Sequence, residues 1–294
     1  MRRDPLPAED GFLGLPTGSA PQARPVRVIP FGMETSVSYG GGTASGPAAI
    51  LQASHQVETF DELMWSEPHQ QLAIQTLADA DVPRDTEAAL AQIEALVEGA
   101  YADGAFPMVL GGEHSVTIGA IRPAVARWPE LTLVQVDAHA DLRDGYEGNP
   151  NSHASAMRRC LDHPGVRVEG FGIRNISAGE IPYLEGNRDR VRMHFAVDRD
   201  DWDLPALVER VRGRPVWITI DVDGLDSPQM PATGTPEPGG LRWTEVMDLL
   251  RPVCRAANVV GADVVELAPI DGFHAPDFLA ARLVYRILTF ALVD

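Results

Sequence analysis

The stretches LTLVQVDAHAD at residues 131–141 and VWITIDVDGLD at residues 216–226 are the clearest indication of the fold. Each starts as an apolar run with β-branched residues, which is typical of a buried strand, and then changes abruptly to acidic residues. Similar apolar runs occur at 26–31, 106–110 and 262–265. Stretches with helical spacing lie between the runs, most clearly Thr86–Gly104. This alternation predicts repeated βαβ units and an α/β fold with a mainly parallel sheet.

The length of 294 residues, without a linker rich in Gly and Ser, fits one large domain. We expect a surface arm at 1–23, which is rich in Pro, Gly and Ala, and the folded domain at 24–294. The arm lacks the apolar segment of a signal peptide, and no apolar run is long enough to span a bilayer. Two cysteines provide no disulfide framework. We therefore expect a cytoplasmic protein that does not bind membranes.

The net charge is −18, and all 24 basic residues are Arg. A negative field repels nucleic acid and draws small cations inward, so we expect a small cationic partner and no nucleic acid. An acidic surface that maintains solubility or reflects salt adaptation explains the same charge, so the charge alone gives weak support.

Acidic residues and histidines follow three of the expected strands. Alternate residues at a strand end point the same way while the chain stays extended, and sites in open parallel sheets lie beyond the carboxyl ends of the strands. We therefore expect these side chains to converge. The candidate metal ligands are His114, Asp137, His139, Asp141, Asp221 and Asp223.

The charges of this set favour a pair of divalent ions. Four clustered carboxylates would repel one another and raise one another's pKa values. Two divalent ions balance them, and oxygen donors with two imidazoles favour Mn²⁺, although such ligands also hold Zn, Fe or Co. A single Asp-x-His or Asp-x-Asp pair is more often a cap or a turn. Three such motifs, each at the end of an apolar run, make that explanation poor.

Five segments resemble the motifs of the ureohydrolase family, which includes arginases, agmatinases and formiminoglutamases, and agmatinases are the most similar. They are GGEHS (111–115), DAHAD (137–141), DVDGLD (221–226), PATGTPEPGG (231–240) and VELAP (265–269). The similarity extends to GGTASGPAAI (41–50) and APDFLAARLVY (275–285). It implies a single-domain, three-layer αβα arginase-like fold around a central, mainly parallel sheet of eight strands.

The resemblance also implies a ligand set for two Mn²⁺ ions. His114, Asp137, Asp141 and Asp221 would bind one ion, and Asp137, His139, Asp221 and Asp223 the other, so that Asp137 and Asp221 bridge. Glu113 stands where many relatives have Asp, beside a ligand, and leaves this assignment intact.

The expected chemistry is attack of a bridging hydroxide on a guanidino carbon, because two ions lower the pKa of a shared water. Asp141 would orient the hydroxide. His153 matches the family's proton-shuttling histidine, and an imidazole suits proton delivery at neutral pH. Glu266 matches the carboxylate that pairs with the guanidinium, and a structural salt bridge is the alternative. Thr235 would border the guanidino site.

The substrate is less constrained. Ser177 stands where arginases present an acidic residue to the amino group, so arginine is disfavoured. Asp144 and Glu147 could meet a distal ammonium, whereas Arg143 could hold a carboxylate, and all three could also be solvated loop charges. We expect agmatine, cleaved to putrescine and urea, with N1-aminopropylagmatine or 4-guanidinobutyrate as alternatives. A catalytically silent relative would have lost a metal ligand, the proton-shuttling histidine or the guanidinium carboxylate, and this sequence contains all of them. The family's trimers and hexamers predict a closed homo-oligomer.

Overall fold

The computed structural model describes residues 3–16, 22–79 and 81–293. Eight strands form one sheet in the order β2-β1-β3-β8-β7-β4-β5-β6, and all neighbouring strands are parallel. The strands are β1 (Arg24–Phe31), β2 (Leu72–Thr76), β3 (Phe106–Gly111), β4 (Thr132–Val136), β5 (Arg167–Ile173), β6 (Val191–Phe195), β7 (Pro215–Asp221) and β8 (Asn258–Val265). The predicted eight-stranded parallel sheet is confirmed.

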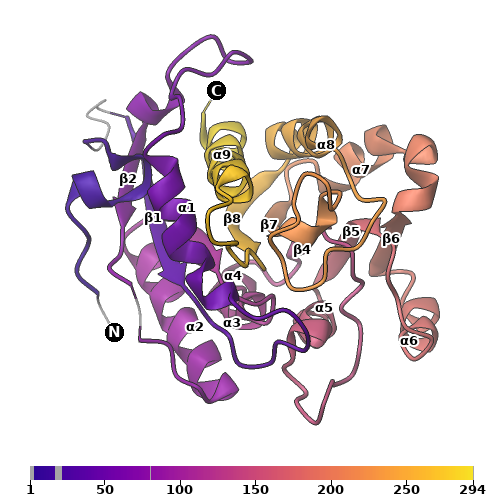
Figure 1. Ribbon diagram of the computed structural model, residues 1–294. Helices are drawn as coiled ribbons and strands as arrows, with labels where there is room; N and C mark the ends of the chain where they lie inside the picture. Colours follow the sequence, from indigo (N-terminus) through magenta and orange to yellow (C-terminus); the bar gives the residue numbers. More distant parts are fainter. Residues whose placement is uncertain (1–2, 17–21, 80, 294) are drawn as a thin grey trace.

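Helices cover both faces of the sheet, which completes the predicted three-layer αβα arrangement (Figure 1). One face packs against α1, α7, α8 and α9, and the other against α2 to α6. The helices are α1 (Gly46–Ser54), α2 (Thr86–Ala102), α3 (Val116–Ala120), α4 (Arg122–Arg127), α5 (Ala156–Cys160), α6 (Ile181–Gly186), α7 (Leu204–Val211), α8 (Trp243–Ala256) and α9 (Ala275–Leu292). Short 3₁₀ segments include Thr43–Ser45 and His153–Ser155.

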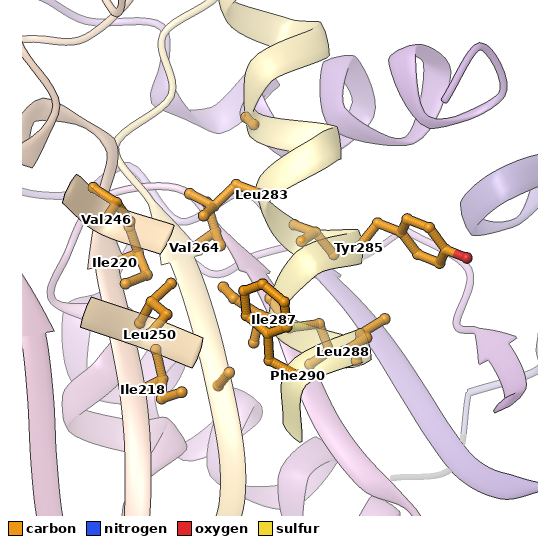
Figure 2. Close-up of a cluster of buried hydrophobic side chains, with 14 of the residues drawn as sticks. Ile218, Ile220, Val246, Leu250, Val264, Leu283, Tyr285, Ile287, Leu288 and Phe290 are labelled. Atoms are coloured by element: carbon orange, nitrogen blue, oxygen red, sulfur yellow. The ribbon is translucent and has the colours of Figure 1, made fainter. Parts of the chain in front are cut away.

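The alternation of side chains in a strand explains the two cores. In β7, Ile218 and Ile220 enter the core under α8 and α9, whereas Trp217 enters the core on the opposite face. Figure 2 shows the first of these cores, where Val246 and Leu250 of α8 approach the sheet residues. Strands buried on both faces read as continuous apolar runs, which is why the sequence revealed them.

The N-terminal segment packs onto the domain within the described residues. Phe12 and Leu13 are buried, and their backbone N–H groups donate to the hydroxyls of Thr76 and Ser54 at 2.9 Å each. Residues 17–21 of the expected arm lie outside the described residues. Over the described residues, no helix combines the length and the apolar character needed to cross a bilayer.

Candidate metal centre

Four neighbouring strands, β3, β8, β7 and β4, carry the candidate site at their carboxyl ends. His114 follows β3, Glu266 follows β8, Asp221 ends β7 and Asp137 follows β4. Because the strands are parallel, these ends meet at one edge of the sheet. All four side chains are buried.

His114 lies among three carboxylates. Its Nδ1 is 3.0 Å from Oδ2 of Asp137, 3.1 Å from Oδ2 of Asp141 and 3.5 Å from Oδ2 of Asp221. Asp141 reaches this point with a φ of +53°, a left-handed conformation that is uncommon for residues other than glycine. Such backbone outliers tend to occur at functional sites.

His139 belongs to a second group, which shares Asp137 with the first. Its Nδ1 lies 3.0 Å from Oδ2 of Asp223 and 3.6 Å from Oδ1 of Asp137. In each of two groups, His114 with Asp137 and Asp141, and His139 with Asp137 and Asp223, the potential ligand atoms lie within 4.8 Å of one another. The structure therefore brings all six candidate ligands together.

The chemistry of this donor set fits divalent cations. Burial raises the pKa of Asp221 well above its ordinary value, and the neighbouring carboxylates of Asp223 and Asp137 raise it further. Nδ1 of His114 is buried, and although three carboxylate oxygens lie within 3.5 Å, no group of the described residues meets it with the geometry of a hydrogen bond. Cations between the side chains would neutralise the carboxylates and accept the lone pair of that nitrogen.

A chain of hydrogen bonds behind the cluster orients His114. Nε2 of His114 is 2.9 Å from Oγ1 of Thr219, whose hydroxyl donates to Asp263 at 2.6 Å. The indole N–H of Trp217 donates to the other oxygen of Asp263, also at 2.6 Å. Such partners fix the tautomer of a metal-binding histidine. Sequence reasoning missed them, and the one available signal was an acidic residue inside the apolar run 262–265.

A cavity of about 170 Å³ opens over the cluster, and His153, Thr235 and Glu266 line its walls. Glu266 has a φ of +65°, and its Oε1 accepts the backbone N–H of His114 at 2.7 Å. Burial raises the pKa of Glu266 to about 8. A cationic group entering the cavity would favour its ionised form.

The loop that follows Asp141 contains the three charged residues that were expected to contact the tail of the substrate, and only one of them reaches the cavity. Arg143 lines the cavity. Asp144 and Glu147 are exposed and are not among the lining residues. The carboxylate of Asp144 pairs with Arg159 at 2.7 Å and with Arg158 at 3.3 Å. The structure thus brings one of these three loop charges to the cavity.

Sequence reasoning did not single out Glu180, which also lines the cavity and is buried. Its Oε1 accepts the N–H of Leu142 at 2.9 Å, and its Oε2 accepts the N–H and hydroxyl of Ser177 at 2.7 Å each. Glu180 therefore gives the cavity wall a carboxylate outside the metal-ligand groups. Glu180 and Leu142 are 38 residues apart in the chain, so no local sequence pattern connects them.

The fold and the cluster at the strand ends define a class, and the comparisons agree with it: the chain belongs to the Arginase family, which its residues 24–289 match. It is 36% identical over 271 residues to N(1)-aminopropylagmatine ureohydrolase of Synechocystis sp., covering 90% of this chain and 88% of that protein. It is 33% identical to agmatinase of Bacillus anthracis, covering 92% and 93%. The solved structure of agmatine ureohydrolase of Thermoplasma volcanium superposes with a TM-score of 0.81 at 31% identity, covering 92% and 90%. The chain is a hydrolase of this family.

Proposed function

We propose that the protein is a ureohydrolase that holds two divalent ions, with Mn²⁺ as the first choice, and splits a guanidino group into urea and an amine. One observation supports this most strongly: two adjacent three-ligand groups share Asp137 beneath a cavity that Glu266 lines. The names of the two relatives support the same reaction type.

His114, Asp137, Asp141 and Asp221 would hold one ion, and Asp137, His139, Asp221 and Asp223 would hold the other. The ions, when bound, lower the pKa of water at the centre and so make hydroxide available near neutral pH. Mixed carboxylate and imidazole donors suit Mn²⁺. Asp141 accepts a hydrogen bond from the attacking nucleophile and orients it.

Glu266 binds the guanidinium. A carboxylate pairs with a planar guanidinium through two parallel hydrogen bonds, and this geometry presents the central carbon in a fixed orientation. Burial raises the pKa of Glu266, and a positively charged substrate beside it favours the ionised carboxylate. Thr235 borders the same part of the cavity.

His153 delivers the proton that the leaving amine needs. An imidazole titrates near neutral pH, so it can accept a proton from the centre and donate it to the leaving nitrogen. His153 lines the cavity, and its ring meets that of Tyr146 edge-on at 6.1 Å. The histidine is therefore accessible to substrate and held on one side by an aromatic ring.

Agmatine is the proposed substrate, with putrescine and urea as products, and N1-aminopropylagmatine is the longer alternative. Glu180 supports a cationic tail, because its carboxylate lies on the cavity wall. Arg143 lines the same cavity and supports a third candidate, 4-guanidinobutyrate, whose carboxylate a guanidinium would hold. We also propose a cytoplasmic location. The protein would form a closed homo-oligomer, a trimer or a hexamer, and sedimentation equilibrium would test this oligomeric state.

Urea release from agmatine, N1-aminopropylagmatine, 4-guanidinobutyrate and arginine, measured side by side with Mn²⁺, tests this proposal. We expect the highest kcat/KM for agmatine and almost no release from arginine. The variant Glu180→Gln should raise KM for agmatine and leave KM for 4-guanidinobutyrate unchanged. Urea release by a metal-stripped sample at the full rate would refute the proposed chemistry.

A further inference from the structure

A buried carboxylate, Glu113, lies directly beside the metal centre without belonging to it. We propose that Glu113 is a positioning residue: acting through the hydroxyl of Ser36, it fixes the orientation of His153 and places the ring proton on Nδ1. This inference rests on the proposed function only in giving His153 its role in proton transfer. The hydrogen bonds that support it belong to the fold itself.

The chain brings Glu113 under the segment that follows β1. The N–H of Gly112 donates to Phe31 at 3.0 Å, and the N–H of Glu113 donates to Met33 at 2.7 Å. A Cβ atom at Gly112 would lie 2.0 Å from the carbonyl oxygen of Met33, so only glycine permits this approach. The side chain of Glu113 therefore reaches the turn at Thr35.

Glu113 is fully buried and receives five donors. Its Oε2 accepts the backbone N–H groups of Thr35 at 2.9 Å and Ser36 at 2.7 Å. Its Oε1 accepts the hydroxyls of Thr35 at 2.9 Å and Ser36 at 3.0 Å, together with that of Ser115. A carboxylate that accepts from all these groups holds the hydroxyl proton of Ser36 on its own side.

Ser36 then has only lone pairs to offer His153. A hydroxyl has one proton and two acceptor lone pairs. The backbone N–H of His153 lies 2.9 Å from Oγ of Ser36, and the ring Nδ1 lies 3.3 Å from the same oxygen. With its proton committed to Glu113, Ser36 accepts from both, which requires a proton on Nδ1.

The opposite ring nitrogen is thereby left as the base. Nε2 of His153 lies 3.4 Å from Oγ of Ser38, a residue of the cavity wall. The hydroxyl of Ser152, 3.3 Å from Nδ1, can either donate or accept and so adapts to the tautomer that Ser36 sets. His153 accordingly presents an unprotonated Nε2 to the cavity when neutral, ready to take up a proton.

Glu113→Gln is the direct test. With its amide oxygen accepting the two N–H groups, its amide nitrogen replaces Oε1 and donates to Ser36, whose hydroxyl proton can then turn toward Nδ1. We expect kcat to fall about tenfold, a part of the roughly 10²–10⁴-fold contribution of a general acid, with KM and metal content unchanged. Ser36→Ala should give a similar loss. Ser115→Ala is the matched control, because it removes a donor to Glu113 that does not touch His153.

A double-mutant cycle separates positioning from general damage. In a His153→Ala background, Glu113→Gln should cause almost no further loss of kcat. The inference would be overturned if Glu113→Gln lowered kcat by the same factor in the His153→Ala background as in the native protein. Loss of metal in Ser36→Ala would overturn it as well.

A readout independent of activity is the ¹⁵N NMR spectrum of the histidine rings in the full chain, loaded with diamagnetic Zn²⁺ and assigned with His153→Ala. We expect Nδ1 to be protonated in the native protein and Nε2 in Glu113→Gln. The same tautomer in both proteins would refute the proposal. If the native protein released no urea, the proposed function would fail while the NMR result still decided the role of Glu113.

Discussion

The hydroxyl of Thr219 lies between the ligand His114 and the buried carboxylate of Asp263. Thr219→Val should therefore weaken metal binding although it replaces no ligand. Valine matches threonine in shape, suits a strand and leaves the fully buried position filled. The substitution removes the 2.6 Å hydrogen bond to Asp263 and the 2.9 Å contact to Nε2 of His114. His114 then loses the partner that fixes its ring and its tautomer.

Two magnitudes follow. Losing a hydrogen bond to a charged group costs about 1.5–3 kcal/mol, and leaving a buried donor unsatisfied costs a further ~1–3 kcal/mol. We therefore expect the free energy of unfolding of the metal-free protein to fall by about 3 kcal/mol. Loss of a hydrogen-bond partner behind a metal ligand lowers metal affinity by roughly 10–100-fold, and we expect that range for Mn²⁺.

Calorimetric titration of the metal-free protein with Mn²⁺, together with urea unfolding, measures both quantities. Thr117→Val is the matched control. Oγ1 of Thr117 lies 3.4 Å from Oγ1 of Thr219, and Thr117 is also a neighbour of Asp263, so its loss should reduce stability and spare His114. Equal Mn²⁺ affinity in the two variants would show that Thr219 does not act through His114.

Three further predictions concern the ligands, the guanidinium site and the sheet. Asp223→Asn should abolish metal content and urea release together while the protein stays folded, since an amide oxygen can still accept the N–H that Asp223 now binds at 3.0 Å; a metal-free but active variant would contradict this. Glu266→Gln should lower kcat/KM by about 100-fold, as expected when a buried charge loses its partner, with metal content retained in elemental analysis. Burial opposes ionisation of Glu169, but hydrogen bonds from His194 and Arg210 lower its pKa in the folded protein. Ionised Glu169 therefore stabilises the fold fully above its pKa in the unfolded chain, about 4.3, and this stabilisation is lost as the pH falls through the lower pKa of the folded state. Glu169→Gln should therefore reduce the free energy of unfolding by about 2 kcal/mol at pH 7, with a shrinking difference in acid, and a constant difference in urea unfolding at all pH values would exclude this role.

The residue pattern alone predicted an α/β fold with a mainly parallel sheet and identified the candidate ligands. Residues 131–136 and 216–220 were recognisable as strands because burial on both faces removes polar residues from a strand. Asp137 and Asp221 were recognisable because the chain places them directly at strand ends, and the carboxyl ends of parallel strands share one edge. Both signals are local in the chain, so no knowledge of strand order was needed to find them.

The side chains that support those ligands are brought to them only by contacts between distant parts of the folded chain. Thr219 lies 105 residues from His114 and 44 residues from Asp263, and the three meet because β8 lies between β7 and β3 in the sheet. Ser36 likewise lies 77 residues from Glu113 and 117 residues from His153. Hydrogen bonds require atoms within about 3 Å, and separations of this size in the chain leave the distance undetermined until the sheet order is fixed.

The positions of the charged residues in the loop after Asp141 could not be predicted from the sequence either. Asp144 and Arg143 are neighbours in the chain, yet one pairs with arginines of α5 while the other lines the cavity. Solvated side chains of similar polarity have no local preference strong enough to decide such a choice, since an exposed ion pair contributes little free energy. The path of the loop over the finished domain decides it instead.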